Sequence, residues 1–277
     1  MIRRPPRSTL SSSSAASDVY KRQVIPYVSC GKCIACRNSK TNCCENISVL
    51  GVHRDGGMQE QITVPVDILL PANHLTDEQM AIVEPLAIGA HAIKRANILS
   101  GETIAVVGCG PIGIGIIKLA EIAGAKVIAI DTNEHRLQFA KDKIGVDYIV
   151  KAGENAIKEV AEITHGDLCT AVFDASGNKN ALETGPNYMS HGGRFVLVGL
   201  YKDVLTFSHP NVHAKEMTLM CSRNATTEDF MHVMGLLNQF PSQSFITHNV
   251  FFSEMIDHFD SWLDPKTGVI KAIVNFN

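Results

Sequence analysis

Four cysteines near the beginning of the chain have the spacing of a metal site. Their pattern is C-x2-C-x2-C-x7-C, and the residues are Cys30, Cys33, Cys36 and Cys44. Four thiolates can bind one zinc ion tetrahedrally, and such a site has no open position at which a reaction could take place. The spacing therefore predicts a structural zinc site that holds a short lobe together. The alternative is a set of free buried thiols, and Cys43 does not fit the spacing.

A second segment has the pattern of a loop that binds a dinucleotide. The sequence GCGPIG occupies residues 108–113, directly after the β-branched run at 103–107 and directly before an apolar helical stretch. In this context Gly108 permits a tight turn, Gly110 allows the backbone to approach a pyrophosphate, and Gly113 allows close packing of helix on strand. The free amides at the start of the helix would then face the phosphate charge. A glycine-rich packing turn without a ligand is the alternative.

The residue at the end of the next strand indicates which dinucleotide binds. Residues 126–130 form a second apolar run, and Asp131 follows it. A carboxylate at this position accepts a hydrogen bond from the ribose 2′-hydroxyl of NAD and disfavours the 2′-phosphate of NADP. Asp131 therefore favours NAD. Arg136, one helical turn later, is the one argument against this preference, because its guanidinium could hold a phosphate; it could equally stack near the adenine.

These loops need a parallel sheet to position them. Apolar runs alternate with helical segments, which predicts right-handed βαβ units and therefore an α/β fold with a doubly wound parallel sheet. The predicted strands are residues 103–107, 126–130, 148–150, 171–174, 194–198 and 219–222, and the predicted helices are residues 114–123 and 135–144. Because ligands bind at the carboxyl ends of such strands, we expect residues 175–177 and Gly199 at the site, with Gly199 beside the nicotinamide. The alternative is that these residues form ordinary loops.

Outside the sheet the sequence predicts shorter elements. We expect a strand at residues 61–65, a helix at residues 76–85 and a connecting helix at residues 88–96. The tail from residue 246 to residue 274 is expected to form a helix and strands that return to the first domain.

Composition excludes several classes of function. The chain has 277 residues, a hydrophobic fraction of 45% and a formal net charge of -3, so it can bury a core, and its charge gives no argument for binding nucleic acid or a membrane surface. Glycines and Lys118 interrupt the apolar region 104–119, which therefore does not suit a membrane span. Five of the eight cysteines lie within 15 residues, which indicates a metal site in the reducing cytoplasm and not a secreted disulfide framework.

The first 23 residues differ in character from the rest. The segment MIRRPPRSTLSSSSAASDVYKRQ is basic and rich in serine, and it has no apolar region of a secretory signal. It resembles the translation of a sequencing adapter, so we expect a non-native, disordered leader and a fold that begins at Val24. A targeting segment or a native tail is the alternative.

Taken in order, the motifs resemble a known family. The cysteine lobe, the sequence Glu84-Pro85-Leu86, the loop GCGPIG and Asp131 are similar to those of the zinc-dependent medium-chain alcohol and polyol dehydrogenases, and the likeness covers residues 24–277. Residues 24–57, 84–96, 191–202 and 221–226 are most similar to a branch that acts on sugar acids. The resemblance implies that the secondary alcohol of a sugar acid passes a hydride to NAD. L-Threonine and sorbitol-like polyols are alternative substrates, and a non-catalytic protein that binds NAD and zinc is an alternative of another class.

The resemblance also implies roles for individual residues. The four cysteines would bind structural zinc, and Glu84 would face a catalytic zinc as its ligand or as the partner of its water. Arg223 would pair with the substrate carboxylate, or would form a salt bridge that lines the cleft. The residues expected to contact NAD are Gly108, Gly110, Pro111, Ile112, Gly113, Asp131, Arg136, Val198, Gly199, Leu200 and Ser222.

One part of the family pattern is missing. The catalytic zinc of the family also needs a cysteine from a GxCGTD-like turn and a histidine from a GHE-like segment upstream of the cysteine lobe, and neither occurs here. We therefore expect an incomplete catalytic zinc site and little turnover from the chain as given. The expected domains are a partial, mostly β catalytic domain at 24–85, a dinucleotide-binding Rossmann domain at 86–223 and a return to the catalytic domain at 224–277. A homodimer or homotetramer is the assembly that the resemblance implies for the full-length form.

Overall fold

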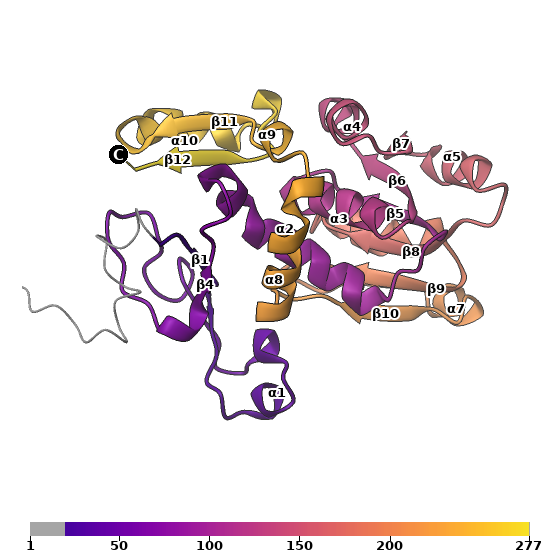
Figure 1. Ribbon diagram of the computed structural model, residues 1–277. Coiled ribbons are helices and arrows are strands. Elements are labelled where there is room, and N and C mark those ends of the chain that lie inside the picture. Colours follow the sequence, from indigo (N-terminus) through magenta and orange to yellow (C-terminus); the bar gives the residue numbers. More distant parts are fainter. Residues whose placement is uncertain (1–19, 277) are drawn as a thin grey trace, which may run out of the picture.

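The computed structural model describes residues 20–276, and a six-stranded parallel sheet forms the larger part of it (Figure 1). The strand order is β10-β9-β8-β5-β6-β7, and every neighbouring pair is parallel. The strands are β5 Thr103–Val107, β6 Lys126–Asp131, β7 Tyr148–Lys151, β8 Cys169–Asp174, β9 Met189–Leu197 and β10 Thr218–Cys221. The chain order reverses beside β5, which is the topology of a doubly wound fold. The predicted α/β class is therefore confirmed.

Alternate side chains of the strands build two separate cores. Ile104 and Val106 belong to the core shared with α2, α3 and α8, whereas Ala105 and Val107 belong to the core on the other face, which α5 covers. This period of two is what a strand imposes when both its faces are buried. The helices of this region are α3 Pro111–Ile122, α4 Glu134–Phe139, η5 Ala140–Ile144, α5 Ala156–Ile163, α6 Lys179–Thr184, η6 Gly185–Tyr188 and α7 His209–Ala214.

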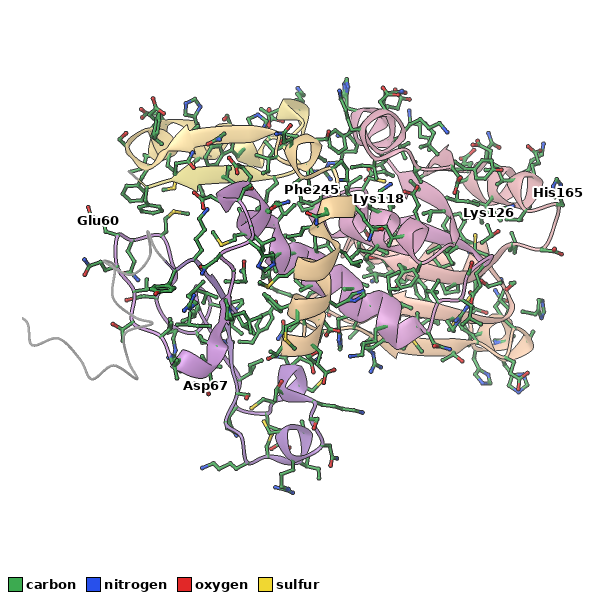
Figure 2. All side chains as sticks on the ribbon, in the orientation of Figure 1. Glu60, Asp67, Lys118, Lys126, His165 and Phe245 are labelled. Atoms are coloured by element: carbon green, nitrogen blue, oxygen red, sulfur yellow. The ribbon has the colours of Figure 1, made fainter. Side chains whose placement is uncertain are left out.

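Because the strands are parallel, their amino ends lie together on one side of the sheet and their carboxyl ends on the other. Lys126, which begins β6, and His165, in the turn before β8, lie at the right-hand end of Figure 2. They mark the amino ends of the strands. The carboxyl ends face the opposite direction, where the predicted ligand-binding loops lie.

Helix α2 (Asp77–Ala96) differs from its prediction. We expected a helix that ends at Pro85 and a second helix from residue 88, but the structure has one continuous helix with Pro85 inside it. Proline removes one helical hydrogen bond, and here the burial of Val83 and Leu86 on α3 and the core outweighs that loss. The predicted domain boundary after Pro85 therefore falls inside a helix.

Short elements precede α2. They are β1 Arg22–Val24, β2 Tyr27–Val28, α1 Ile34–Arg37, η3 Thr41–Cys43, β3 Ser48–Val49, η4 Val66–Ile68 and β4 Leu69–Pro71. Strand β1 pairs antiparallel with β4, and β2 pairs antiparallel with β3. The strand expected at residues 61–65 is wrong, because no strand forms there. An alternating pattern gives a strand only where a neighbouring strand supplies its hydrogen bonds.

The predicted end of the leader is also wrong. Arg22 pairs with Pro71 and Gln23 pairs with Leu70, and Gln23 is buried. The ordered chain therefore includes residues that we assigned to the disordered leader. Residues 1–19 lie outside the part of the chain that the structure describes.

The chain after the sheet forms α8 and a small unit. Its elements are α8 Thr227–Leu236, η7 Leu237–Gln239, α9 Ser242–Phe245, β11 His248–Phe251, η8 Phe252–Glu254, α10 Met255–Leu263, η9 Pro265–Thr267 and β12 Ala272–Asn275. Strands β11 and β12 pair in parallel, which confirms the predicted helix and strands of the tail. In Figure 1 this unit lies above α2 and the lobe that carries α1 lies below it. Within residues 20–276, no helix is long and apolar enough to cross a membrane.

Candidate functional site

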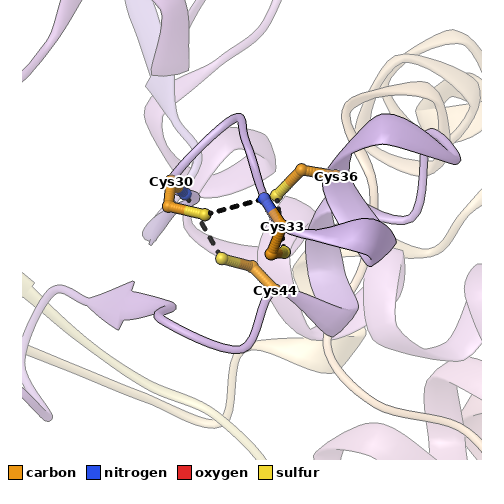
Figure 3. A group of neighbouring side chains, drawn as sticks. All are labelled: Cys30, Cys33, Cys36 and Cys44. Carbon is orange, nitrogen blue, oxygen red and sulfur yellow. Dashed lines mark hydrogen bonds between the residues drawn. The ribbon is translucent and has the colours of Figure 1, made fainter.

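The structure brings the four predicted zinc ligands together. The sulfur atoms of Cys30, Cys33, Cys36 and Cys44 all lie within 4.8 Å of one another (Figure 3). Backbone N–H groups point at two of these sulfurs: Cys33 N donates to Cys30 Sγ at 3.4 Å, and Cys30 N donates to Cys44 Sγ at 3.2 Å. Cys43 is exposed and lies outside the group.

The electrostatics of this lobe suit a metal cation. Backbone N–H groups of Lys32 and Cys33 lower the pKa of the Cys30 thiol to about 6. The N–H groups of Cys36 and Glu45 likewise lower the pKa of Cys33, whereas burial and the neighbouring thiols raise the pKa of Cys36 to about 11. Zinc binds thiolates, so a set that contains easily ionised thiols beside one another fits the ion.

The glycine loop has the shape that a pyrophosphate requires. Gly108 has a φ of +96°, and a Cβ there would lie 2.8 Å from Ser176 N. A Cβ on Gly113 would overlap the Gly108 carbonyl oxygen. Gly110 caps the start of α3 and has open space around its Cα, with no atom within 4 Å of an added Cβ. The loop therefore closes tightly at two glycines and stays open at the third, where a ligand would lie.

Asp131 fastens this loop to the sheet. Its Oδ2 accepts a hydrogen bond of 2.6 Å from Cys109 N, and its Oδ1 accepts one of 2.8 Å from Asn133 N. Burial and the charge of Asp131 raise the pKa of Cys109. The charge of Arg136 opposes this shift by acting to lower the pKa of Cys109. The Nε atom of Arg136 is buried without a hydrogen-bond partner in the described chain. A buried donor without a partner and a carboxylate with free lone pairs, which both influence Cys109, fit the adenosine half of a dinucleotide.

The loops after β8 and β9 lie against each other. Asp174, at the end of β8, accepts hydrogen bonds of 3.0 Å from the N–H groups of Ser176 and Gly177. A Cβ on Gly199 would overlap Gly177 N, so only glycine fits there. Burial raises the pKa of Asp174 against the opposing effect of those hydrogen bonds. The glycine at residue 199 therefore allows the loop after β9 to pack directly on the loop after β8.

The turn after β10 joins this group. Ser222 is buried, its N–H donates to Leu197 O at 2.8 Å, and its Oγ has no hydrogen-bond partner in the described chain. Val198 packs on the core, and Leu200 is 81% exposed. Arg223 is exposed and has no ion pair with a described carboxylate, so the structure does not show the salt bridge that was its alternative role.

Glu84 has two partners that sequence reasoning missed. It lies half-buried in α2 and accepts a short hydrogen bond from the Tyr27 hydroxyl. Burial and the charge of Glu84 raise the pKa of Tyr27. Burial lowers the pKa of Lys271, and the charge of Glu84 opposes that shift. A lone lysine in the apolar run 269–274 is a signal that could have identified Lys271, whereas nothing near Tyr27 in the sequence points to Glu84.

Comparisons with known proteins found two family models that match parts of the chain. Residues 111–239 match the family described as zinc-binding dehydrogenase. Residues 16–74 match the alcohol dehydrogenase GroES-like domain, and this match begins inside the segment that we expected to be a leader.

Individual proteins are similar over most of the chain. The chain is 40% identical over 255 residues to L-galactonate-5-dehydrogenase of Escherichia coli (strain K12). This alignment covers 91% of this chain and 75% of that protein. The chain is 36% identical over 251 residues to an uncharacterised zinc-type alcohol dehydrogenase-like protein of Haemophilus influenzae, which covers 87% of this chain and 73% of that protein. A crystal structure from Escherichia coli CFT073, described as a short chain alcohol dehydrogenase complexed with NADH, superimposes with a TM-score of 0.84 at 28% identity and covers 91% of this chain and 76% of that one.

Proposed function

The chain belongs to the zinc-binding alcohol dehydrogenase family, and we propose that it serves the NAD-dependent oxidation of a sugar acid resembling L-galactonate. Enzymes of this family act on CH–OH groups, with a nicotinamide dinucleotide as hydride acceptor. The 40% identity to L-galactonate-5-dehydrogenase supports the substrate class, and tagaturonate would then be the product. In this step the secondary alcohol carbon loses a hydride to NAD and its hydroxyl loses a proton, which leaves a ketone.

The observation that carries the proposal is the hydrogen bond between the glycine loop that follows β5 and the Asp131 carboxylate at the end of β6. Asp131 holds the Cys109 amide at 2.6 Å and still has lone pairs for a ribose hydroxyl. Around it, the residues proposed to bind NAD are Gly108, Gly110, Pro111, Ile112, Gly113, Arg136, Val198, Gly199, Leu200 and Ser222. A carboxylate beside the adenosine ribose favours NAD over NADP.

The four cysteines of the lobe are proposed to bind one structural zinc ion. All four ligand positions would be filled by sulfur, so this ion would take no part in hydride transfer. Its work would be to fix the lobe between β2 and β3. The eight described cysteines are all free of disulfides, which fits the reducing cytoplasm as the compartment of the protein.

Arg223 is proposed to bind the carboxylate of the substrate. It directly follows Ser222 at the carboxyl end of β10 and is exposed, with no ion pair to a described carboxylate. Arg223→Ala should therefore raise the KM for an acid substrate far more than the KM for a neutral polyol. An equal effect on both substrates would contradict this role.

A catalytic zinc ion would polarise the substrate hydroxyl, and Glu84 is proposed to face it. Within residues 20–276, the cysteine lobe is the one group of three or more histidine, cysteine, aspartate or glutamate side chains close enough to share a metal ion. One carboxylate holds a metal ion weakly. We therefore propose that the 277-residue chain binds NAD but turns over little substrate.

Because the cysteine lobe is the one such metal-binding group within residues 20–276, a second candidate is a non-catalytic protein that binds NAD and zinc. L-Threonine and sorbitol-like polyols are the alternative substrates if the protein is catalytic, and a homo-oligomer is the proposed assembly of the full-length form. Three measurements on the purified chain separate these possibilities: zinc stoichiometry, fluorescence titration with NADH and NADPH, and NAD reduction with L-galactonate, L-threonine and sorbitol. Tighter binding of NADH than of NADPH supports the cofactor assignment, and failure to bind either would overturn it. Robust NAD reduction by the 277-residue chain would refute the proposed low turnover.

A further inference from the structure

A buried asparagine connects the cysteine lobe to the rest of the protein. Asn42 lies in η3, two residues before Cys44, and is 3% exposed. Its Nδ2 donates to the carbonyl oxygen of Arg223 at 2.8 Å and lies 3.0 Å from His91 Nε2. Asn224 Nδ2 donates in return to the Asn42 carbonyl at 3.5 Å. Two residues of the turn after β10 therefore contact one residue of the lobe.

The Arg223 carbonyl fixes the orientation of the amide. A carbonyl can only accept, so it must face Nδ2, and the second Nδ2 proton is then directed at His91 Nε2. His91 Nε2 is consequently an acceptor, and the ring carries its proton on Nδ1, which donates to Asp229 Oδ2 at 2.7 Å. Asp229 is 3% exposed and also accepts from Thr226 N and Thr226 Oγ1. Both protons of the Asn42 amide are thus used, and no other side chain of similar size offers two donors here.

The same turn is attached to the loop proposed to hold the nicotinamide. Ser222 precedes Arg223, and its N–H donates to Leu197 O at 2.8 Å, directly before residues 198–200. A continuous path of backbone and hydrogen bonds therefore runs from Cys44 through Asn42 and the 222–224 turn to the end of β9. In Figure 1 the lobe that carries α1 lies beside the end of α8 that follows this turn.

We propose that Asn42 is a positioning residue that couples metal binding by the cysteine lobe to dinucleotide binding beside the 222–224 turn. This inference rests on the proposed function, because it takes zinc and NAD as the two ligands. Asn42 is held between Cys36 and Cys44 along the chain, so an ion bound by the four sulfurs fixes the backbone that carries its amide. Without the ion, the lobe loses four bonds, and the amide loses the support that keeps it on the Arg223 carbonyl.

The coupling has a thermodynamic signature. Coupling between two sites in proteins commonly changes affinity by about 5-fold or more, and the effect must be reciprocal. Zinc should therefore tighten NADH binding about 5-fold or more, and NADH should tighten zinc binding by the same factor. A purely structural lobe would give neither effect in a folded chain.

The test uses the 277-residue chain and measures the Kd of NADH by fluorescence, first with zinc loaded and then after removal by a chelator. Asn42→Leu keeps the size of the side chain but removes both donors, and Asn42→Asp keeps its shape with acceptors only. Asn38→Leu changes an exposed asparagine of the same lobe and is the matched control. Circular dichroism and zinc stoichiometry establish that each variant is folded and loaded.

The expected result is that zinc tightens NADH binding about 5-fold or more in the wild type and in Asn38→Leu. In the two Asn42 variants zinc should change the Kd of NADH less than about 2-fold. An equal zinc effect in all four proteins, or no zinc effect in the wild type, would overturn the coupling. If zinc-loaded wild type binds no NADH, the proposed function itself fails, and the coupling fails with it. Where an Asn42 variant does not fold, competition with a chelator in the presence and absence of NADH tests the reciprocal effect in the wild type, and an unchanged zinc affinity would again overturn the coupling.

Discussion

Replacing Asp131 by asparagine is the sharpest test of the dinucleotide site. The change keeps the size of the side chain but removes its charge and one of its two acceptors. In the structure each carboxylate oxygen accepts one backbone N–H, from Cys109 at 2.6 Å and from Asn133 at 2.8 Å. The new amide must turn its NH₂ group toward one of these N–H groups, which leaves that donor without an acceptor. An unsatisfied buried donor costs about 1–3 kcal/mol, so the free energy of unfolding should fall by about that amount.

The effect on cofactor choice should be larger than the effect on stability. A hydrogen bond to a charged group contributes about 1.5–3 kcal/mol, which corresponds to about 10-fold or more in NADH affinity. NADPH should lose less, because the variant no longer repels its 2′-phosphate. The ratio of the two dissociation constants, measured by fluorescence titration, should therefore shift toward NADPH by about 10-fold.

Asp167→Asn is the matched control. It removes the same charge from an exposed residue near His165, at the amino ends of the strands and away from the loop. It should change neither the ratio of dissociation constants nor the unfolding midpoint. If Asp131→Asn also leaves the ratio unchanged, Asp131 does not contact the ribose, and the preference for NAD must have another origin.

Three further results are expected. Gly110→Ala should leave thermal stability nearly unchanged, because its Cβ has open space, but should weaken NADH binding, whereas Gly113→Ala should impair folding, since its Cβ would overlap the Gly108 carbonyl. Removing zinc with a chelator should lower the thermal unfolding midpoint of the wild type, and Cys44→Ser should reduce the zinc stoichiometry and show little further response to the chelator. For Asp229, burial alone would raise the pKa, but hydrogen bonds from His91 and Thr226 outweigh it and lower the pKa from 3.8 to about 2. A carboxyl group with a lowered pKa stabilises the fold above about pH 4, and this contribution is lost as the pH falls toward 2. Asp229→Asn should therefore lower the free energy of unfolding, measured with urea, by about 2 kcal/mol at pH 6 and by clearly less at pH 3.

The part of the fold that the sequence predicted is the part built from local patterns. The runs at residues 103–107 and 126–130 are β-branched, continuous and flanked by glycine or aspartate, and strands β5 and β6 form there. Where the structure differs, a distant partner decides the outcome. Burial against α3 keeps α2 continuous through Pro85, and pairing with β4 makes a strand of Arg22 and Gln23. Residues 61–65 have the alternation of a strand, but alternation alone did not give one.

The two halves of the candidate site differ in the same way. The adenosine part of the dinucleotide site uses a loop, a strand end and a helix within residues 108–136, so its contacts join neighbours along the chain and follow from their spacing. The group around Glu84, which is proposed to face a catalytic zinc ion, joins Tyr27 and Lys271, and no spacing rule connects these residues. Because the adenosine part of the site is assembled by a single βαβ unit, the chain should bind NADH whether or not Glu84 holds a metal ion. Binding without turnover is therefore the expected behaviour of this chain. Glu84→Gln should leave the Kd of NADH unchanged. The same change removes the charge beside the Tyr27 hydroxyl and should bring the pKa of Tyr27 down toward its ordinary value. A loss of NADH affinity in Glu84→Gln would show that the two halves are one site.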